Sequence, residues 1–212
     1  MIVDLSQTIL EGMPVYPSDE PVSLKHTRFL NTDGFNNSVL KQGMHIGTHV
    51  DGLMHMSESA QTIDLFSVDR FCGSAKVFDV CGIQSIQPEH LDWNEIQEDD
   101  IIIFYTGFDV YYSQNKYYQD HPSISEELAD KIIAKQIKMI GVDMPSPDHS
   151  PFLVHKKLFD AGIFIVENLT GLNQIFLHNA VSTVQKVHFY ALPLKIAADS
   201  SPVRAVAVYN ET

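Results

Sequence analysis

The chain has 212 residues, 44% of them hydrophobic, and a formal charge of −13 from 27 acidic and 14 basic side chains. This length and composition predict one folded domain over residues 1–212 and exclude long disordered segments. The acidic balance, with no cluster of Lys or Arg to attract a phosphate backbone, argues against nucleic acid as a partner.

The sequence shows no signal for export or for membrane insertion. Its first residues, MIVDLS, lack a basic region followed by an apolar core, and no run of about 18 apolar residues occurs. Cys72 and Cys81 have neither redox nor disulfide spacing, so we expect both to be buried as small hydrophobic residues. These features predict a cytoplasmic protein whose partner is a small molecule and not a membrane.

The N-terminal third of the sequence is irregular, with turn-forming residues at 12–14 and 16–19. Two β-like runs follow, at residues 75–80 and 101–105. The second is almost entirely Ile and aromatic, which is typical of a strand buried on both faces.

The first predicted helix covers residues 123–135. Its start has two interpretations: Ser123 and Glu126 form a capping box, or Ser125 is the N-cap ahead of an acidic first turn. In either case, the apolar residues that follow recur at the spacing of one helix face.

A second helix is predicted to begin at Pro151, with Ser150 as its N-cap, and to stop at Gly162. Apolar runs predict further strands at residues 138–142, 163–166, 187–192 and 203–209. Many strands interspersed with two clear helices predict an α/β or α+β fold.

The most informative stretch is HIGTHVDGLMH at residues 45–55, which places three imidazoles and one carboxylate within eleven residues. Imidazole nitrogen and carboxylate oxygen are ligands of zinc, manganese and iron. Since no cysteine takes part, the pattern fits a catalytic metal site better than a structural one.

A straight element cannot bring these groups onto one ion. In a helix His45 and His49 would share one face, and Asp51 would point to the other side. In a strand six residues span about 20 Å, whereas ligands lie about 2 Å from a metal. The chain must therefore bend between His45 and Asp51, and Gly47 permits that bend.

Two residues further along the chain offer another nitrogen and oxygen ligand. His155 lies in the second predicted helix with Phe152 and Phe159 on the same face, so it points toward the core. Glu167 ends an apolar strand. Each alone is consistent with an ordinary structural role, but together they would supply ligands from rigid elements.

A Ser-His-Asp triad is the competing catalytic interpretation. Ser146 and Asp148 lie close to His149 in the sequence. The Gly-x-Ser-x-Gly elbow that presents such a serine is absent from the sequence, so the metal site is favoured.

Residues 45–55 resemble the HxGTHxDxPxH motif of the putative cyclase family, which includes bacterial kynurenine formamidase and isatin hydrolase. The similarity covers nearly the whole chain. Other segments that resemble the family lie at residues 4–6, 12–17, 105–107, 141–148, 155–169, 192–194 and 201–205.

The resemblance implies an α/β fold of the swivelling β/β/α type, with a β-rich core flanked by helices. It implies a homodimer or homotetramer and one or two divalent ions per chain, zinc or manganese. The implied metal ligands are His45, His49 and Asp51 for one ion, with His155 and Glu167 holding a second ion that Asp51 bridges.

The resemblance also implies that His55 is the catalytic acid/base. One departure from the motif bears on this residue: Leu53 stands where the family has a proline. Proline fixes φ at about −65°. Without it, and with Gly52 alongside, we expect a freer link between Asp51 and His55.

These features predict a metal-dependent hydrolase that cleaves a carbon–nitrogen amide bond, in a formamide such as N-formylkynurenine or in a cyclic amide, through a metal-activated water. Two alternatives remain: the same machinery acting on a lactone or other carbonyl substrate, and a non-catalytic metal-binding protein. Tyr16 is the predicted substrate-binding residue. Phe66 and Phe108 are further aromatics for an apolar pocket, with core packing as the alternative role for all three.

Overall fold

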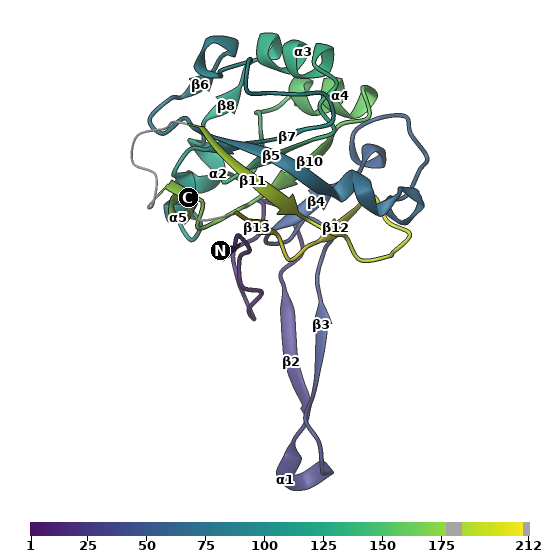
Figure 1. Ribbon diagram of the computed structural model, residues 1–212. Coiled ribbons are helices and arrows are strands. Elements are labelled where there is room, and N and C mark those ends of the chain that lie inside the picture. Colours follow the sequence, from purple (N-terminus) through teal and green to yellow (C-terminus); the bar gives the residue numbers. More distant parts are fainter. Residues whose placement is uncertain (177–183, 210–212) are drawn as a thin grey trace.

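The structure is a computed structural model that describes residues 1–176 and 184–209 (Figure 1). The strands are β1 (Ile2–Asp4), β2 (Ser23–Arg28), β3 (Asn37–Lys41), β4 (His49–Asp51), β5 (Cys72–Asp79), β6 (Ser85–Ile86), β7 (Ile101–Tyr105), β8 (Ser123–Ile124), β9 (Met139–Val142), β10 (Phe164–Glu167), β11 (Val184–Tyr190), β12 (Ser200–Pro202) and β13 (Val206–Val208). The helices are α1 (Leu30–Asp33), α2 (Lys116–Gln119), α3 (Glu126–Ala134), α4 (Leu153–Asp160) and α5 (Asn173–Phe176).

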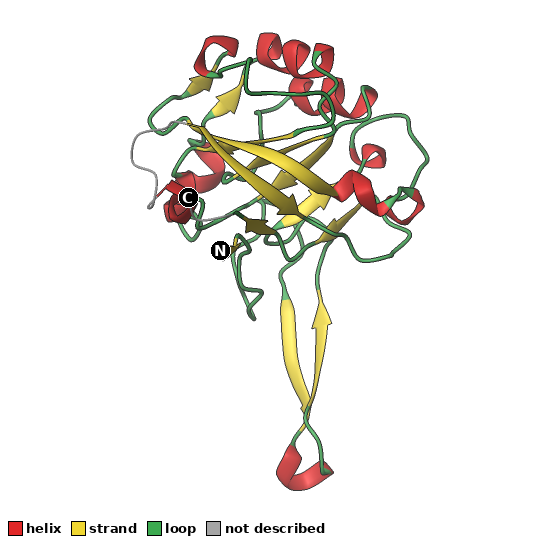
Figure 2. Ribbon diagram, viewed as in Figure 1, coloured by secondary structure: helices red, strands yellow, loops and turns green. Residues whose placement is uncertain are grey.

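One sheet of nine strands organises the body of the molecule, in the order β1-β13-β11-β5-β7-β9-β10-β4-β12. The four central strands, β5, β7, β9 and β10, run parallel to one another, and the outer pairs are antiparallel. Helices α3 and α4 pack together above the sheet in the view of Figure 2. This confirms the predicted α/β fold with a β-rich core.

The central strands also confirm the prediction of buried β structure. The run at residues 101–105 is β7, and its residues from Ile101 to Phe104 are fully buried. The other predicted central strands fall on β5, β9 and β10, with ends shifted by at most three residues. Strands without a polar face are stable here because a central parallel sheet is covered on both sides.

The C-terminal strands differ from the prediction. The strand expected at 187–192 is β11, which begins three residues earlier and ends at Tyr190. In the run expected at 203–209, only Val206–Val208 forms a strand, β13, and Val203 makes an isolated bridge with Pro193. The reason is topological: β12 lies at one edge of the sheet and β13 near the other, so the chain between them must cross over.

Helix α3 begins at Glu126, three residues later than predicted. The hydroxyl of Ser125 accepts a hydrogen bond from the Leu128 N–H at 3.1 Å, so the second interpretation of its start is correct. Ser123 instead belongs to β8, which pairs with β6. Local capping rules do not detect this pairing because it depends on a segment far away in the chain.

Helix α4 begins two residues after the predicted start, so Ser150 and Pro151 lie outside it. Asp148 binds the N-terminal end of α4 instead: Oδ2 of Asp148 accepts a hydrogen bond from the Val154 N–H at 2.7 Å. A carboxylate is favourable there because the first N–H groups of a helix lack internal partners. The predicted stop at Gly162 is confirmed by its left-handed φ of 79°.

The two cysteines are less buried than predicted. Cys72 is half-buried at the start of β5 and Cys81 is exposed in the turn that follows it, and both are free thiols. None of the helices within residues 1–176 and 184–209 has the length and apolar character needed to cross a membrane.

A hairpin formed by β2 and β3 projects from the body, with α1 at its tip (Figures 1 and 2). The irregular structure predicted for this region is wrong at both strands. Every residue of β3 and the last four of β2 are exposed. Strand periodicity arises from burying one face, so a ribbon that buries neither face gives no such signal.

Candidate metal centre

The predicted bend lies at Gly47, whose φ is 60°. A Cβ at this position would meet the Met13 side chain at 3.3 Å, so glycine suits both the conformation and the space. Beyond the bend, His49 and Asp51 occupy alternate positions of β4 and share one face. The turn carries His45 back beside that face, and its Nδ1 lies 2.7 Å from Oδ1 of Asp51.

Thr48 ties this turn to three distant segments. Its hydroxyl donates to the carbonyl of Asn168 at 2.7 Å and accepts from the Gln7 N–H at 2.8 Å. Its carbonyl accepts from the Val203 N–H at 3.0 Å. The ligand-bearing turn is therefore held by the tertiary structure as well as by its own sequence.

The register between β4 and β10 brings the two predicted ligand groups together. The strands run antiparallel with Glu167 opposite His49. One carboxylate oxygen of Glu167, Oε2, lies 3.4 Å from Nε2 of His49, and the other, Oε1, lies 3.2 Å from Nε2 of His155. Glu167 thus links the histidine turn to helix α4.

His49 directs a lone pair at two carboxylates. Its Nδ1 bonds to the carbonyl of Gly47 at 2.9 Å, which leaves Nε2 of the neutral ring as an acceptor. That Nε2 lies 3.2 Å from Oδ1 of Asp51 and 3.4 Å from Oε2 of Glu167. His49 Nε2 and Asp51 Oδ1 are buried and form no well-directed hydrogen bond among the described residues, although His45 Nδ1 lies 2.7 Å from that oxygen. Buried acceptors that converge in this way require a cation or a proton between them.

His155 is buried, with ring contacts to Phe152 and Phe159, as its place in the helix predicted. Its Nδ1 lies 2.5 Å from Oδ1 of Asp148, which fixes the orientation of the ring. The opposite nitrogen, Nε2, then faces Glu167. A carboxylate that holds the outer nitrogen of a histidine is a common feature of metal sites.

Asp199 lies between His45 and His55, with its Oδ2 2.7 Å from His45 Nε2 and 3.4 Å from His55 Nδ1. The two imidazole rings are close, with centroids 4.0 Å apart. Asp199 was not predictable from local patterns, because it lies 154 residues from His45 and in none of the motifs. Asp148 was noted within a motif, but its role beside His155 was not identified.

The link from Asp51 to His55 forms a short turn, although Leu53 replaces the proline of the motif. Residues Leu53–His55 form a 3₁₀ turn in which the His55 N–H bonds to the Gly52 carbonyl at 3.1 Å. Leu53 itself is buried in the core. A Cβ on Gly52 would lie 2.6 Å from the carbonyl oxygen of Asp199, so the close approach of these segments depends on glycine.

Within the described parts of the chain, two groups of side chains have ligand atoms within 4.8 Å of one another, and they share Asp51. The groups are His45, Asp51 and His55, and His49, Asp51 and Glu167. The first differs from the predicted set because it contains His55 in place of His49, although His49 Nε2 lies 3.2 Å from Oδ1 of Asp51. Nitrogen and oxygen donors, with two buried acceptors that form no well-directed hydrogen bond among these residues, fit a divalent ion such as zinc or manganese.

His45, His49, His55, His155 and Glu167 line a cavity of about 190 Å³. Its apolar and aromatic lining comprises Pro14, Val15, Tyr16, Met56, Tyr112, Tyr118, Pro145 and Phe152. Tyr16 packs edge-on against Tyr118 at 5.8 Å between centroids. Phe66 packs on Phe164 and Phe108 stacks on Tyr117, so these two take the core role and not the pocket role.

The alternative Ser-His-Asp triad does not form. The hydroxyl of Ser146 donates to the main-chain carbonyl of Asp148 at 2.6 Å. The carboxylate of Asp148 holds His155, and His149 Nε2 lies 3.1 Å from the carbonyl of His121. Serine, histidine and carboxylate therefore have separate partners.

The four histidines around Asp51 and Glu167 differ in their ionisation. At His49 burial disfavours the charged ring, but the carboxylates of Asp51 and Glu167 outweigh it and raise the pKa. Burial disfavours a charged His45, but the carboxylates of Asp51 and Asp199 outweigh it and raise its pKa to about 11. At His155 the carboxylates of Asp148 and Glu167 likewise outweigh burial and raise the pKa to about 10. At His55 burial dominates and lowers the pKa below 6.5, so this imidazole is neutral at pH 7.

Divalent metal is therefore expected to displace protons when it binds. A ligating imidazole must be neutral, whereas the raised pKa values of His45 and His155 keep both protonated at pH 7 without metal. Affinity should rise with pH from about 7 toward 10. Calorimetric titration of zinc in two buffers of different ionisation enthalpy should show at least about one proton released per ion. Binding without proton release and without pH dependence would contradict the assignment.

Comparisons with known proteins agree with this geometry. Residues 3–149 match the sequence profile described as putative cyclase. Kynurenine formamidase of Bacillus thuringiensis (strain Al Hakam) is 30% identical over 210 residues, which cover 96% of this chain and 95% of that protein.

Solved structures show the same fold. A protein described as a potential metal-dependent hydrolase with cyclase activity is 26% identical, with a TM-score of 0.77 over 98% of this chain and 96% of its own. Isatin hydrolase A from Labrenzia aggregata, at 20% identity, has a TM-score of 0.85 over 99% of this chain and 94% of its own. With the histidine motif, the profile match and the full-length relatives in agreement, the chain belongs to the putative cyclase family.

Proposed function

We propose that this protein is a metal-dependent hydrolase that cleaves the carbon–nitrogen bond of a formamide or a cyclic amide. The observation that carries this proposal is the convergence of His45, His49, Asp51 and Glu167 beside a cavity, with His49 Nε2 and Asp51 Oδ1 buried and forming no well-directed hydrogen bond within the described parts of the chain. Similarity to kynurenine formamidases over nearly the whole chain supports the bond that is cleaved.

From the family resemblance, the proposed ligands are His45, His49 and Asp51 for one ion, and His155 and Glu167, together with Asp51, for a second. The ligand atoms within 4.8 Å of one another are grouped differently, as His45, Asp51 and His55 and as His49, Asp51 and Glu167. Zinc and manganese both suit this donor set. Asp199 and Asp148 hold the outer nitrogens of His45 and His155 and so orient their rings.

When bound, a divalent ion lowers the pKa of a water molecule from 15.7 toward about 7 and polarises the carbonyl oxygen of the substrate. His55 carries the proton. Its Nδ1 faces Asp199, which leaves Nε2 for proton transfer, and its lowered pKa keeps it neutral at pH 7. It takes a proton from the attacking water as a general base and returns it to the leaving nitrogen as a general acid.

The cavity walls favour a flat, apolar substrate body. Tyr16, Tyr112, Tyr118 and Phe152 present aromatic surface beside the candidate ligands. Aromatic walls with a few convergent polar groups are typical of small-molecule sites and suit an aryl formamide. Tyr16 is proposed to contact the substrate ring.

The test is a hydrolysis screen of protein loaded with zinc or manganese. We expect turnover of N-formylkynurenine or of a cyclic amide such as isatin, and loss of that turnover after chelation. Turnover of lactones alone would overturn the amide assignment. A protein that binds metal and hydrolyses none of these classes would overturn the hydrolase assignment.

We further propose that the protein acts in the cytoplasm as a single-domain homodimer or homotetramer, without a membrane or nucleic-acid partner. The family resemblance supports the assembly, and the charge of −13 argues against a nucleic-acid partner. The chain has a mass of 23.8 kDa. Light scattering at micromolar concentration is expected to give at least twice this mass, and a monomer mass would refute the assembly.

A further inference from the structure

The cavity beside the candidate metal centre has two ends that differ in exposure. At one end the candidate ligands His49 and Glu167 are buried, and this end is called the floor. At the other end Tyr16 and Asp19 are exposed and Tyr118 is half-buried. These three residues, which line the same cavity, are called the mouth. A substrate with its amide group at the floor therefore places its opposite end at the mouth.

A tight turn puts the carboxylate of Asp19 at the mouth. The Asp19 N–H donates to the carbonyl of Tyr16 at 3.0 Å, with Pro17 and Ser18 as the two central residues of the turn. Ser18 has a φ of 87°, the left-handed value that the third position of a type II turn requires, and proline suits the position before it. A serine keeps such a φ only where its surroundings impose it.

The chain on both sides of this turn is anchored. Met13, before the turn, and Val22, after it, pack with Ile46 in a small apolar cluster that is separate from the main core. The Tyr112 hydroxyl donates to the carbonyl of Pro14 at 3.4 Å. The turn is therefore a fixed wall of the cavity, and Asp19 has a defined position in it.

Two tyrosine rings lie beside this carboxylate. The rings of Tyr16 and Tyr118 have centroids 5.8 Å apart and planes at 87° to each other. Burial raises the pKa of Tyr118 to about 12, and the negative charge of Asp19 adds to this effect. The pKa of Tyr16 is also raised, by burial and then by the charges of Glu167 and Asp19. Perpendicular ring faces next to an anion are an arrangement that binds an organic cation.

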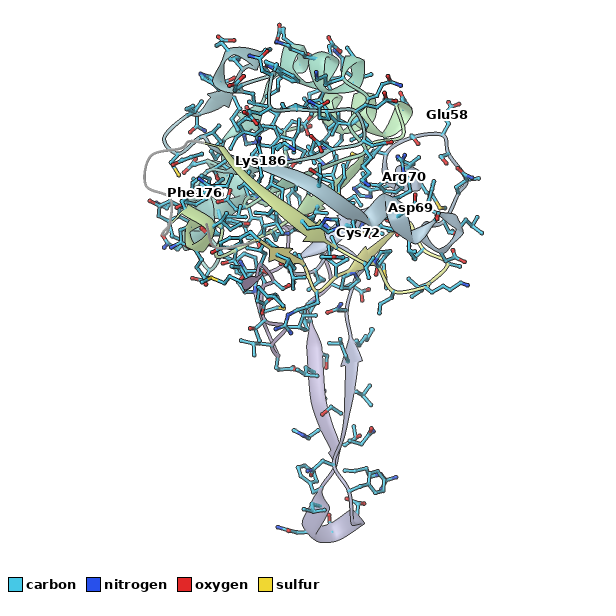
Figure 3. All side chains as sticks on the ribbon, viewed as in Figure 1. Glu58, Asp69, Arg70, Cys72, Phe176 and Lys186 are labelled. Carbon is cyan, nitrogen blue, oxygen red and sulfur yellow. The ribbon has the colours of Figure 1, made fainter. Side chains whose placement is uncertain are left out.

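No basic side chain accompanies Asp19 in the cavity. None of the described residues that line the cavity is Lys or Arg, and the sequence has neither at residues 177–183 and 210–212. Figure 3 shows Arg70 and Lys186 on the body of the molecule, where Arg70 donates to a main-chain carbonyl and Lys186 pairs with a glutamate. The mouth therefore presents one negative charge and no positive charge that could bind a carboxylate.

We propose that the mouth binds a primary ammonium group of the substrate and that Asp19 determines this specificity. The substrate class is then an aryl formamide whose side chain ends in an ammonium group and carries no carboxylate. N-formylkynurenine carries both groups, so its carboxylate would have no partner at the mouth. The inference rests on the proposed function, because that function places the formamide at the floor. The charge of the floor changes with the ions that it holds, whereas that of the mouth is set by Asp19.

Three aryl ketones test this charge preference without hydrolysis. Each is an ortho-aminophenyl ketone, the product side of an aryl formamide, and they differ only in whether the side chain ends in an ammonium, a methyl or a carboxylate group. In calorimetry on the zinc-loaded protein, we expect the ammonium ketone to bind about 10-fold more tightly than the methyl ketone, from one charge pair and one cation–π contact. The carboxylate ketone should bind most weakly. The preference should shrink in about 1 M salt, where the Debye length is about 3 Å.

Three variants locate the preference at Asp19. Asp19→Asn should reduce it to about 2-fold, since only the aromatic contact remains, whereas Asp19→Glu keeps the charge and should keep the preference. Glu20→Gln is the matched control, because it removes the same charge one residue further along. The side chain of Glu20 is 81% exposed, lies 3.7 Å from Lys41 and does not line the cavity. Such an exposed pair contributes little, so Glu20→Gln should keep the full preference.

Equal binding of the ammonium and methyl ketones by the wild type would overturn the inference, as would a preference that Asp19→Asn leaves unchanged. Tighter binding of the carboxylate ketone than of the ammonium ketone would overturn it in favour of an anionic substrate. A charge preference in a protein that hydrolyses no formamide would reject the proposed function alone. Formamide hydrolysis by a protein without the preference would reject this inference alone.

Discussion

Replacing His49 with alanine is expected to release the divalent metal and abolish hydrolysis together. His49 is 1% exposed, and its Nε2 points at Asp51 and Glu167 with no hydrogen-bond donor from the described residues between them. The variant leaves two buried carboxylates without the nitrogen that completes the ligand set. The expected loss of metal affinity exceeds the roughly 10- to 100-fold that follows from removing an outer partner of a ligand.

Metal content after dialysis, by elemental analysis, and turnover of the best substrate measure these two effects. His188→Ala is the matched control, because His188 is an exposed histidine on β11 away from the candidate ligands. The control should keep both metal and activity. A His49→Ala protein with wild-type metal content would show that His49 is not a ligand.

His55→Ala is expected to keep its metal and to lose turnover by roughly 10²- to 10⁴-fold, the contribution of a positioned acid/base group. His55 lines the cavity on a rigid 3₁₀ turn, and its Nδ1 is held 3.4 Å from Asp199. Its loss removes proton transfer to the leaving nitrogen but leaves His49 and Glu167 in place.

The pH profile gives an independent readout of His55. Burial lowers its pKa below 6.5, and the neutral form is the active base, so turnover at saturating metal should fall only as the pH drops below about 6.5. His55→Ala should lose this acidic limb along with its turnover.

Two outcomes would change the role of His55. Full turnover by His55→Ala would exclude proton transfer by this residue. Loss of metal together with activity would make His55 a ligand, a role that its place near His45 and Asp51 also allows.

The local part of the site was predictable from the sequence. The spacing of His45, His49 and Asp51 demanded a bend, and Gly47 was the residue able to make it, as its φ of 60° confirms. The buried strands and the existence of α3 and α4 were also predictable. Apolar runs, caps and glycine stops act within a few residues of one another.

Whatever depended on contacts between distant segments was not predictable. Asp199 reaches His45 across 154 residues, and β8 forms only because a partner strand, β6, is available. The hairpin of β2 and β3 has no strand-like sequence pattern, because neither of its faces is buried against the rest of the chain.

The sequence by itself determined which chemical groups are present and that those of residues 45–55 must converge, because ligand chemistry and local backbone geometry are encoded by neighbouring residues. Only the tertiary structure decided that Glu167 lies opposite His49, since a shift of one residue between β4 and β10 would turn that carboxylate to the other face of the sheet. It likewise decided that Leu53 is buried and that residues 53–55 form a 3₁₀ turn with His55 beside His45. Strand register and burial are properties of the whole packed chain, and no local pattern of residues contains them.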